Sequence, residues 1–430
     1  MTTRKSPVIA FFPEASFGAA LNCIGIAQAL AKLGATPVFI THGGFTGVFS
    51  DYGFEEHYVE PSSASTIEET GRYWEEFLAR HLPHFNLTPQ QQLTTYVAPV
   101  WDAIVDTAVD LEQGLTHVLN QIAPDLIVLD NVIMFPAIAR FGCPWVRIVS
   151  CAETEVRDAN VPPYLSGLDP SEGLQIAEFN AEYLEAVDRP HKRYNTFRTH
   201  AGLAPLPAGE FLENSDDLNL LLAPSIVRFE REAPLEAPRF ALLEGCVRDE
   251  RPYQVPEFPA NDGPLVYLSF GSLGSTDVQF LQRIIDAVAT IPARFLVNVG
   301  ALIESYSKVP DNVHLQDWFP QPSVIEQCDL FIHHGGNNSF CEALYFGVPS
   351  LVIPYCWDGH DTARRAVECG VGDRLDRWSM TDALLQDKIT TLLDAAAMRA
   401  RLQENAKAMQ QKPGAMTAAR KILDVLPANT

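Results

Sequence analysis

Basic residues are scarce in this sequence of 430 residues, which has 31 Lys and Arg against 54 Asp and Glu and a formal net charge of -23. Such an acidic chain lacks the long-range attraction to nucleic acid or to an anionic membrane surface that a basic chain has. We therefore expect no nucleic-acid partner. A small anionic ligand would need a local site that attracts an anion despite the negative net charge.

Long apolar runs are also missing. An early one, residues 8–12, ends at Pro13 and Glu14, and none approaches the roughly 18 residues that a membrane-spanning helix needs. The eight cysteines are scattered, with no Cys-x-x-Cys pair and no metal-ligand spacing. These absences predict a protein without a signal peptide or membrane span, located in a reducing cytoplasm.

Short apolar segments alternate with helical patterns along the chain. In the first half, buried parallel strands are expected at residues 8–12, 37–40, 125–129 and 145–149. A stretch rich in Pro and Glu follows, and after it the alternation of apolar segments and helical patterns begins again. Strands are expected there at residues 265–270, 293–299, 313–315, 330–333 and 350–353. The pattern predicts an α/β fold of two facing, Rossmann-like, doubly wound domains.

The same pattern gives domain limits. We expect an N-terminal domain at residues 1–235, a connection at 236–262 and a C-terminal domain at 263–410. A last helix at 411–430 follows Pro413 and should pack back across the domain junction. Two regions, 60–95 and 153–215, are less regular and are expected to form the mouth of a substrate cleft.

A glycine turn follows the strand at 330–333. Gly335 and Gly336 permit close backbone approach, and a helix begins near Asn338 and Ser339. The free N–H groups and the positive dipole end of a helix N-terminus suit a phosphate group. Ser339 and Glu342 also match the Ser-x-x-Glu capping box, which would serve only to start the helix.

The surrounding motifs favour the binding site. They are His334, Asp317-Trp-Phe-Pro-Gln321, Gly347-Val-Pro349 and Pro354-Tyr-Cys-Trp-Asp358. Together these residues resemble the UDP-glycosyltransferase superfamily, family 1 of the glycosyltransferases, and within it the bacterial natural-product or macrolide type. The resemblance covers nearly the whole C-terminal half and, more weakly, the N-terminal half. It implies a GT-B fold, with an acceptor-binding N-terminal domain and a C-terminal domain that binds the nucleotide-sugar donor.

The resemblance also implies a role for each position. Trp318 would stack on the base, Gln321 would lie near the base or ribose, and Glu342 would accept hydrogen bonds from ribose hydroxyls. The two phosphates would be held by Ser272, His334, Gly336, Asn338 and Ser339. No Asp-x-Asp motif occurs in the chain. An inverting transfer without a metal or other cofactor is therefore implied, with the leaving group stabilised by His334 and the helix N-terminus.

Two positions depart from the family pattern. Asp358 falls on the acidic position that binds sugar hydroxyls, but Gly359 replaces the usual Gln. Three interpretations are open. His360 replaces the sugar contact of the missing Gln, or the pocket takes a different hexose, or Gly359 only shapes the turn. In the N-terminal domain Ala19 occupies the position of the usual catalytic His, and Ala cannot accept a proton.

The Asp that orients this His in the family matches Asp130, although Asp130 could also simply cap the next turn. A general base typically contributes about 10²–10⁴-fold to the rate. Without the His, Asp130 or Glu14 acts as the base, or the acceptor is an amine or carboxylate that needs none, or the protein binds donor without turnover.

The leading hypothesis is an inverting hexosyltransferase that uses a UDP-sugar, or a dTDP-sugar, and a small, largely apolar acceptor such as a natural product. The loss of the His motivates a second hypothesis, an inactive or auxiliary protein that only binds the nucleotide sugar. A GT-B nucleotide-sugar epimerase is a third.

Overall fold

The computed structural model describes residues 6–63, 65–258 and 262–427. Its first sheet has the order β3-β2-β1-β4-β5-β6-β7 and is parallel throughout. The strands are β1 (Val8–Pro13), β2 (Thr36–Thr41), β3 (Glu55–Tyr58), β4 (Leu126–Asp130), β5 (Trp145–Val149), β6 (Leu218–Leu222) and β7 (Phe240–Leu243).

The second sheet is also parallel, with the order β10-β9-β8-β11-β12-β13. Its strands are β8 (Leu265–Ser269), β9 (Arg294–Asn298), β10 (Val313–Gln316), β11 (Leu330–His333), β12 (Ser350–Val352) and β13 (Gly372–Arg374). The predicted fold of two doubly wound α/β domains is confirmed.

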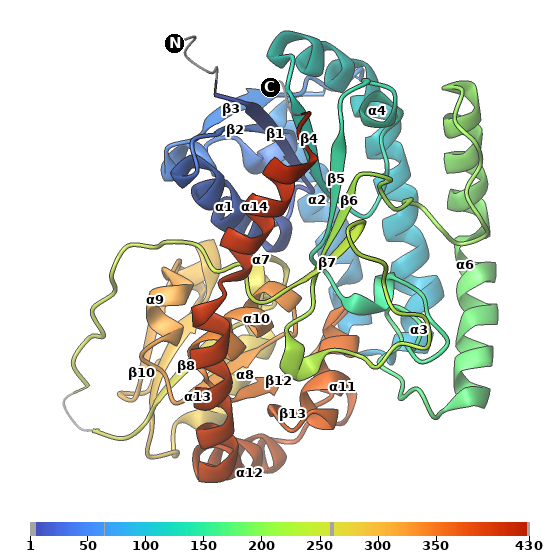
Figure 1. Ribbon diagram of the computed structural model, residues 1–430. Helices are drawn as coiled ribbons and strands as arrows, with labels where there is room; N and C mark the ends of the chain where they lie inside the picture. Colours follow the sequence, from blue (N-terminus) through green and yellow to red (C-terminus); the bar gives the residue numbers. More distant parts are fainter. Residues whose placement is uncertain (1–5, 64, 259–261, 428–430) are drawn as a thin grey trace.

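Helices cover both faces of each sheet (Figure 1). On the N-terminal sheet they are α1 (Phe17–Lys32), α2 (Ile67–His81), α3 (Pro89–Gln92), α4 (Ala98–Ile122), α5 (Pro136–Ala139) and α6 (Gly173–His200). On the C-terminal sheet they are α7 (Gly271–Gly274), α8 (Val278–Val288), α9 (Gln321–Ile325), α10 (Asn337–Phe346), α11 (Gly359–Glu368), α12 (Asp382–Leu393) and α13 (Ala396–Gln411). The chain returns to the first domain in α14 (Gly414–Val425).

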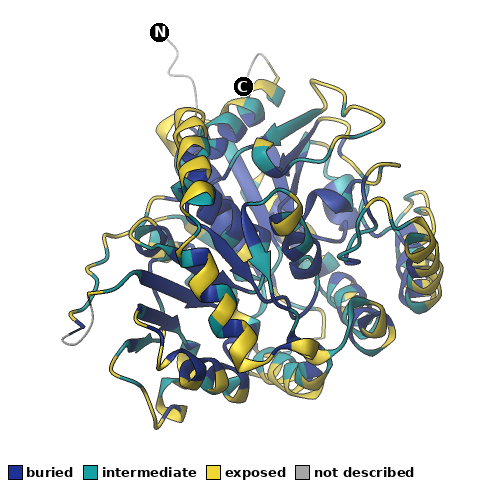
Figure 2. Cartoon of the chain, turned by 90° about the horizontal axis from the view of Figure 1, so that it is seen from below, coloured by how far each residue is buried: buried dark blue, intermediate teal, exposed yellow. Residues whose placement is uncertain are grey.

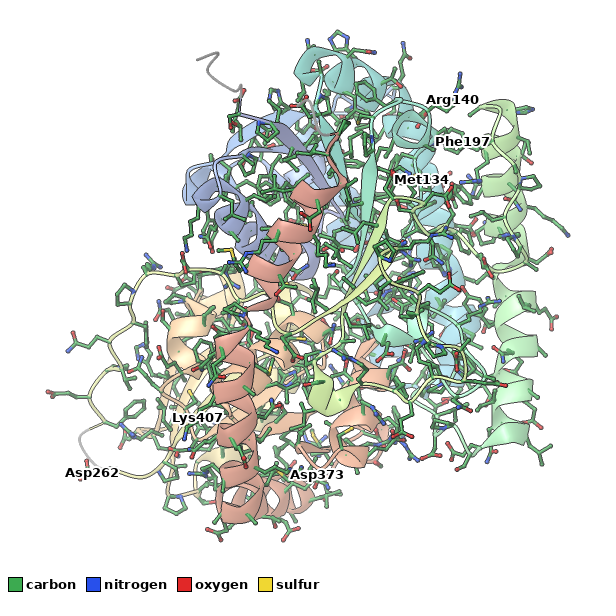
Figure 3. All side chains as sticks on the ribbon, in the orientation of Figure 1. Met134, Arg140, Phe197, Asp262, Asp373 and Lys407 are labelled. Atoms are coloured by element: carbon green, nitrogen blue, oxygen red, sulfur yellow. The ribbon has the colours of Figure 1, made fainter. Side chains whose placement is uncertain are left out.

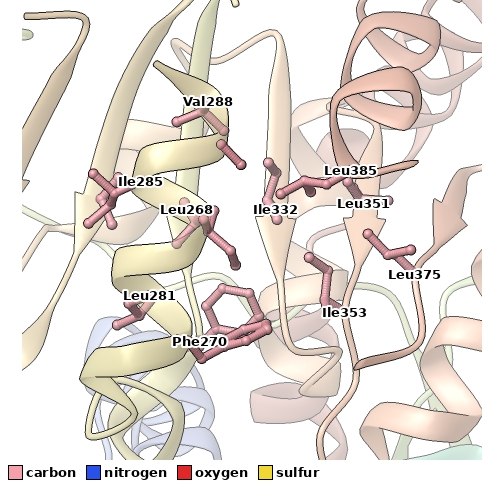
Figure 4. Close-up of a cluster of buried hydrophobic side chains, with 14 of the residues drawn as sticks. Leu268, Phe270, Leu281, Ile285, Val288, Ile332, Leu351, Ile353, Leu375 and Leu385 are labelled. Carbon is pink, nitrogen blue, oxygen red and sulfur yellow. The ribbon is translucent and has the colours of Figure 1, made fainter. Parts of the chain in front are cut away.

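The alternating side chains of each strand explain these layers. In β1, Ile9 and Phe11 face the core beneath α1 and α14, whereas Ala10 and Phe12 face the core beneath α4. Both strand faces are therefore buried, as Figure 2 shows for the centre of the molecule. In the C-terminal domain, apolar side chains of α8 and α12 pack against β8, β11 and β12 (Figure 4).

The last helix packs as the sequence predicts. Ala418, Ala419 and Ile422 of α14 are buried in the same core as α1, and α14 contacts β6 and β7. Residues 428–430 of the predicted segment lie outside the described residues. Figure 1 shows α14 in red beside the blue α1, so the end of the chain joins the two domains.

Two predictions are wrong in detail. The predicted connection 236–262 contains the edge strand β7, so the segment between the sheets begins after Leu243. The regions 60–95 and 153–215 contain α2 and the 28-residue α6. Side chains fill the space beneath α6, where the Tyr194 hydroxyl donates to the Met134 carbonyl at 2.8 Å (Figure 3).

No helix among the described residues is long and apolar enough to cross a membrane.

The two sheets face each other through their carboxyl ends. Asn337, at the start of α10, donates from its side chain to the carbonyl oxygens of Ser150 and Leu222, each at 3.0 Å. Those two residues lie at the ends of β5 and β6, and α10 follows β11. The functional candidates from both halves of the chain therefore meet at this junction.

Candidate active site

The N-cap residue of α10 provides no side-chain hydrogen bond. The helix begins at Asn337 after Gly336, which has no side chain to cap it, and the Asn337 N–H donates to the Asp358 carboxylate. Ser339 lies inside the first turn, so the capping box that Ser339 and Glu342 could have formed is not present. Within the described parts of the chain, the backbone N–H groups of Asn338 and Ser339 have no hydrogen-bond partner. Free N–H donors at a helix N-terminus form a binding site for an anion.

His334 lies beside this N-terminus and is held closely. Its ring stacks on Tyr355 at a centroid distance of 5.1 Å. A Cβ at Gly271 would lie 2.9 Å from its Cε1 atom, and a Cβ at Gly336 would lie 2.7 Å from its Nε2 atom. Burial lowers the pKa of His334 to about 4, so the ring is neutral at pH 7 and can donate one hydrogen bond. Ser272 is exposed, while Gly336 and Ser339 are partly exposed.

Gly359 packs against the backbone of the glycine turn. A Cβ at Gly359 would lie 2.5 Å from the His334 carbonyl oxygen. Any side chain there would displace backbone, which favours the interpretation that Gly359 shapes the turn. His360 instead points to the N-terminal domain, where its Nε2 atom lies 3.1 Å from Gln92 Oε1. The neighbouring Asp358 accepts from the Asn337 N–H at 3.3 Å, and burial raises its pKa.

The residues expected to bind the nucleoside are also brought together. Trp318 is partly exposed and contacts Phe17 of α1 at a ring distance of 5.4 Å. Gln321 Nε2 donates to Ser339 Oγ at 3.0 Å and to Glu342 Oε2 at 2.7 Å. The other oxygen of Glu342 accepts from Arg248 Nη1 at 2.7 Å. Sequence reasoning missed Arg248, because nothing in the connection between the domains singles it out.

Asp130 lies at the end of β4 but is enclosed, with 2% of its surface exposed. Its Oδ1 atom accepts from Ser150 Oγ at 2.6 Å, and Oδ2 accepts from Asn22 Nδ2 at 3.2 Å and from Cys23 Sγ at 3.5 Å. Burial raises the pKa of Asp130 to about 7. Asn22 lies one helical turn after the buried Ala19. An amide therefore contacts Asp130 from α1, a contact that sequence reasoning also missed.

Glu14 is the more accessible carboxylate at the same sheet edge. It follows β1 directly, and its N–H donates to the Asp130 carbonyl oxygen at 2.7 Å. Its side chain is partly exposed and accepts one hydrogen bond in the described structure, from Ser16 Oγ at 3.3 Å. Burial raises its pKa. Glu14 can therefore meet a substrate that Asp130 cannot reach in this conformation.

Comparison with known proteins finds similar sequences among the glycosyltransferases. Residues 282–425 match the C-terminal domain family described as erythromycin biosynthesis protein CIII-like, a range that contains α9, β11, α10 and α11. The NDP-glycosyltransferase YjiC of Bacillus subtilis is 28% identical over 230 residues, which cover 53% of this chain and 58% of YjiC. In sequence, these parts of the chain are therefore similar to glycosyltransferases. The chain spans little more than half the length of this curated relative.

Solved structures of glycosyltransferases share the fold of this chain over nearly its whole length. The glycotransferase of kitacinnamycin superposes with a TM-score of 0.72 at 19% identity and covers 99% of this chain and 100% of its own. The glycosyltransferase VinC, in complex with dTDP, has a TM-score of 0.64 at 21% identity and covers 98% of this chain and 99% of its own. No cluster of three or more His, Cys, Asp or Glu side chains that could hold a metal occurs in the described ranges.

Proposed function

We propose that this chain transfers a hexose from a nucleoside diphosphate sugar, linked to UDP or dTDP, to a small and largely apolar acceptor. The observation that carries the proposal is the N-terminus of α10, where the N–H groups of Asn338 and Ser339 have no partner among the described residues and the ring of His334 lies alongside. The names of the relatives agree with this class of donor, since YjiC is called an NDP-glycosyltransferase and VinC binds dTDP.

The proposed reaction is a single displacement. The acceptor atom attacks the anomeric carbon, the bond from this carbon to the diphosphate oxygen breaks, and the configuration inverts. The N–H groups of Asn338 and Ser339 and the neutral imidazole of His334 stabilise the charge that develops on the diphosphate. Because the chain carries no Asp-x-Asp motif, we propose that these donors act without a metal.

We propose Glu14 as the base that removes the proton of an alcohol or phenol acceptor. Both oxygens of Asp130 already accept hydrogen bonds in a buried network, whereas Glu14 keeps acceptor capacity and partial exposure. Its raised pKa also makes it a stronger base than an ordinary glutamate. In this arrangement Asp130 positions β1 and α1 around the cleft.

Aromatic side chains pack between His334 and the N-terminal domain. Tyr355, which stacks on His334, lies 4.8 Å from Phe85 between ring centroids, and Phe85 lies 5.4 Å from Tyr96. Trp357, just before Asp358, lies 5.7 Å from Trp101 of α4. Phe85, Tyr96, Tyr355 and Trp101 are buried, so these contacts hold the domain junction beside His334.

A screen of donors and acceptors tests the proposal. The chain is incubated with UDP-glucose or dTDP-glucose and with alcohols, phenols, amines and acids as separate groups. We expect release of the nucleoside diphosphate together with a mass gain of one hexose on an acceptor. Nucleotide binding without either signal would instead support the binding-only protein, which the buried Asp130 and Ala19 favour. Conversion of the sugar nucleotide without an acceptor would indicate an epimerase.

A further inference from the structure

The first turn of α11 carries a carboxylate that binds a loop of the other domain. Asp361 is 6% exposed. Its Oδ2 atom accepts from Thr154 Oγ1 at 2.7 Å and from the Leu165 N–H at 2.8 Å, and its Oδ1 atom accepts from the Gly167 N–H at 2.8 Å. All three donors belong to the N-terminal domain, in the loop of residues 154–167 that follows β5. One side chain of the C-terminal domain therefore holds both ends of this loop.

The contact between this loop and α11 is close as well as polar. A Cβ at Gly167 would lie 3.0 Å from the His360 carbonyl oxygen, so the backbone of the loop packs directly on the backbone of α11. Arg364, one turn further along α11, donates to Asp169 at 2.7 Å, but these side chains are 31% and 27% exposed and their ion pair contributes little. Hydrogen bonds to a buried charged acceptor contribute more. The carboxylate of Asp361 is therefore the main polar attachment of the loop.

The same turn of α11 meets a second segment of the N-terminal domain. His360 Nε2 lies 3.1 Å from Gln92 Oε1, and Gln92 Nε2 donates to the Tyr355 carbonyl oxygen at 2.8 Å. Gln92 ends α3, which lies beside α11 at the junction (Figure 1). These contacts do not involve Asp361. Residues 85–97, which contain Gln92, and the loop 154–167 thus rest on one turn of α11 through separate contacts.

We propose that Asp361 locks the domain junction: its carboxylate holds the loop 154–167 on α11, and the two domains separate when this loop is released. Because residues 85–97 rest on the same turn, release of the loop should expose that segment as well. The lock uses none of the residues proposed to bind the donor or to act as the base. The inference goes beyond the proposed function and does not depend on it.

The substitution Asp361→Asn should release the lock. An amide has one oxygen and one nitrogen, so in either orientation its nitrogen faces a backbone N–H group, that of Leu165 or that of Gly167. Hydrogen exchange of the full chain, measured by mass spectrometry without nucleotide, tests this. The amides of residues 154–167 and of residues 85–97 should both exchange about tenfold faster than in the unaltered chain, because exchange follows the population of the open state. Faster exchange in 154–167 alone would show a local anchor and overturn the inference, as would no change in either segment.

Glu56→Gln is the matched control. The carboxylate of Glu56 in β3 also accepts three hydrogen bonds, from the N–H groups of Phe49 at 2.6 Å and Ser50 at 2.8 Å on one oxygen and of Gly47 at 2.7 Å on the other. All of these residues lie within the N-terminal domain. The substitution should speed exchange at residues 47–50 and leave residues 85–97 unchanged. An equal rise at 85–97 in the control would attribute the effect to lost stability and contradict the lock.

The variant Thr154→Val keeps the carboxylate and removes one of its three donors. Both segments should then exchange about threefold faster than in the unaltered chain. This variant decides the case if Asp361→Asn does not fold, since unchanged exchange at residues 85–97 in a folded Thr154→Val protein would contradict the inference.

Discussion

Replacing Gly335 with alanine should lower the free energy of unfolding by about 2–5 kcal/mol and remove nucleotide binding. Gly335 has φ +95°, a conformation that costs other residues energy. An added Cβ would also lie 2.7 Å from the Gly359 carbonyl oxygen and 2.8 Å from Val352 Cγ1. The strain falls on the turn that positions the N-terminus of α10. Both the free energy of unfolding and the affinity for the nucleotide should therefore fall.

Gly34→Ala provides the matched control. Gly34 has φ +91°, nearly the same backbone conformation, but nothing lies within 4 Å of its added Cβ. The free energy of unfolding of this variant should therefore fall only by the conformational cost of the positive φ, about 1–2 kcal/mol. Denaturant unfolding of both variants, with calorimetric titration of dTDP, measures the difference. Equal destabilisation by the two substitutions would show that close packing at Gly335 contributes nothing.

Replacing Glu14 with glutamine should reduce kcat by about 10²–10⁴-fold with an alcohol or phenol acceptor and leave donor binding intact. Glutamine keeps the shape of the side chain but cannot take a proton. The pH dependence follows from the raised pKa of Glu14. Since a base works only when deprotonated, kcat/KM of the unaltered chain should fall on acidification at a pH above the usual range of a glutamate. That acidic limb should be absent from the residual activity of the variant.

The substitution Asp130→Asn distinguishes the role of Asp130 from that of Glu14. Because Asp130 accepts three hydrogen bonds in a buried site, an amide there leaves donors unpaired and should mainly lower the thermal midpoint. The reverse result, a normal rate for Glu14→Gln and an inactive but stable Asp130→Asn protein, would assign the base to Asp130.

Much of the fold could be predicted because buried parallel strands are continuous apolar runs. Residues 145–149 and 330–333 were predicted with the bounds that β5 and β11 have. The missed edge strand β3 has the sequence Glu-Glu-His-Tyr and leaves its side chains partly or fully exposed, so no apolar pattern marks it. The long α6 was missed because it has few buried side chains and contains Pro190.

The proposed donor site could be predicted from the sequence where its residues lie close together along the chain. The strand, glycine turn and helix from β11 to α10 lie within one short segment, whose pattern indicates phosphate binding. Arg248 and Glu342 are separated by 94 positions, and their pairing depends on how the connection between the domains packs. Likewise, the enclosure of Asp130 by Asn22 and Ser150 depends on contacts between three separate elements.

We propose above all that the N-terminus of α10 holds the diphosphate of the donor. A crystal structure of the chain with dTDP bound tests this most directly. The account predicts phosphate oxygens within hydrogen-bond distance of the backbone nitrogens of Asn338 and Ser339, with the base lying on the ring of Trp318. A nucleotide bound elsewhere, or one whose phosphates do not touch α10, would contradict it.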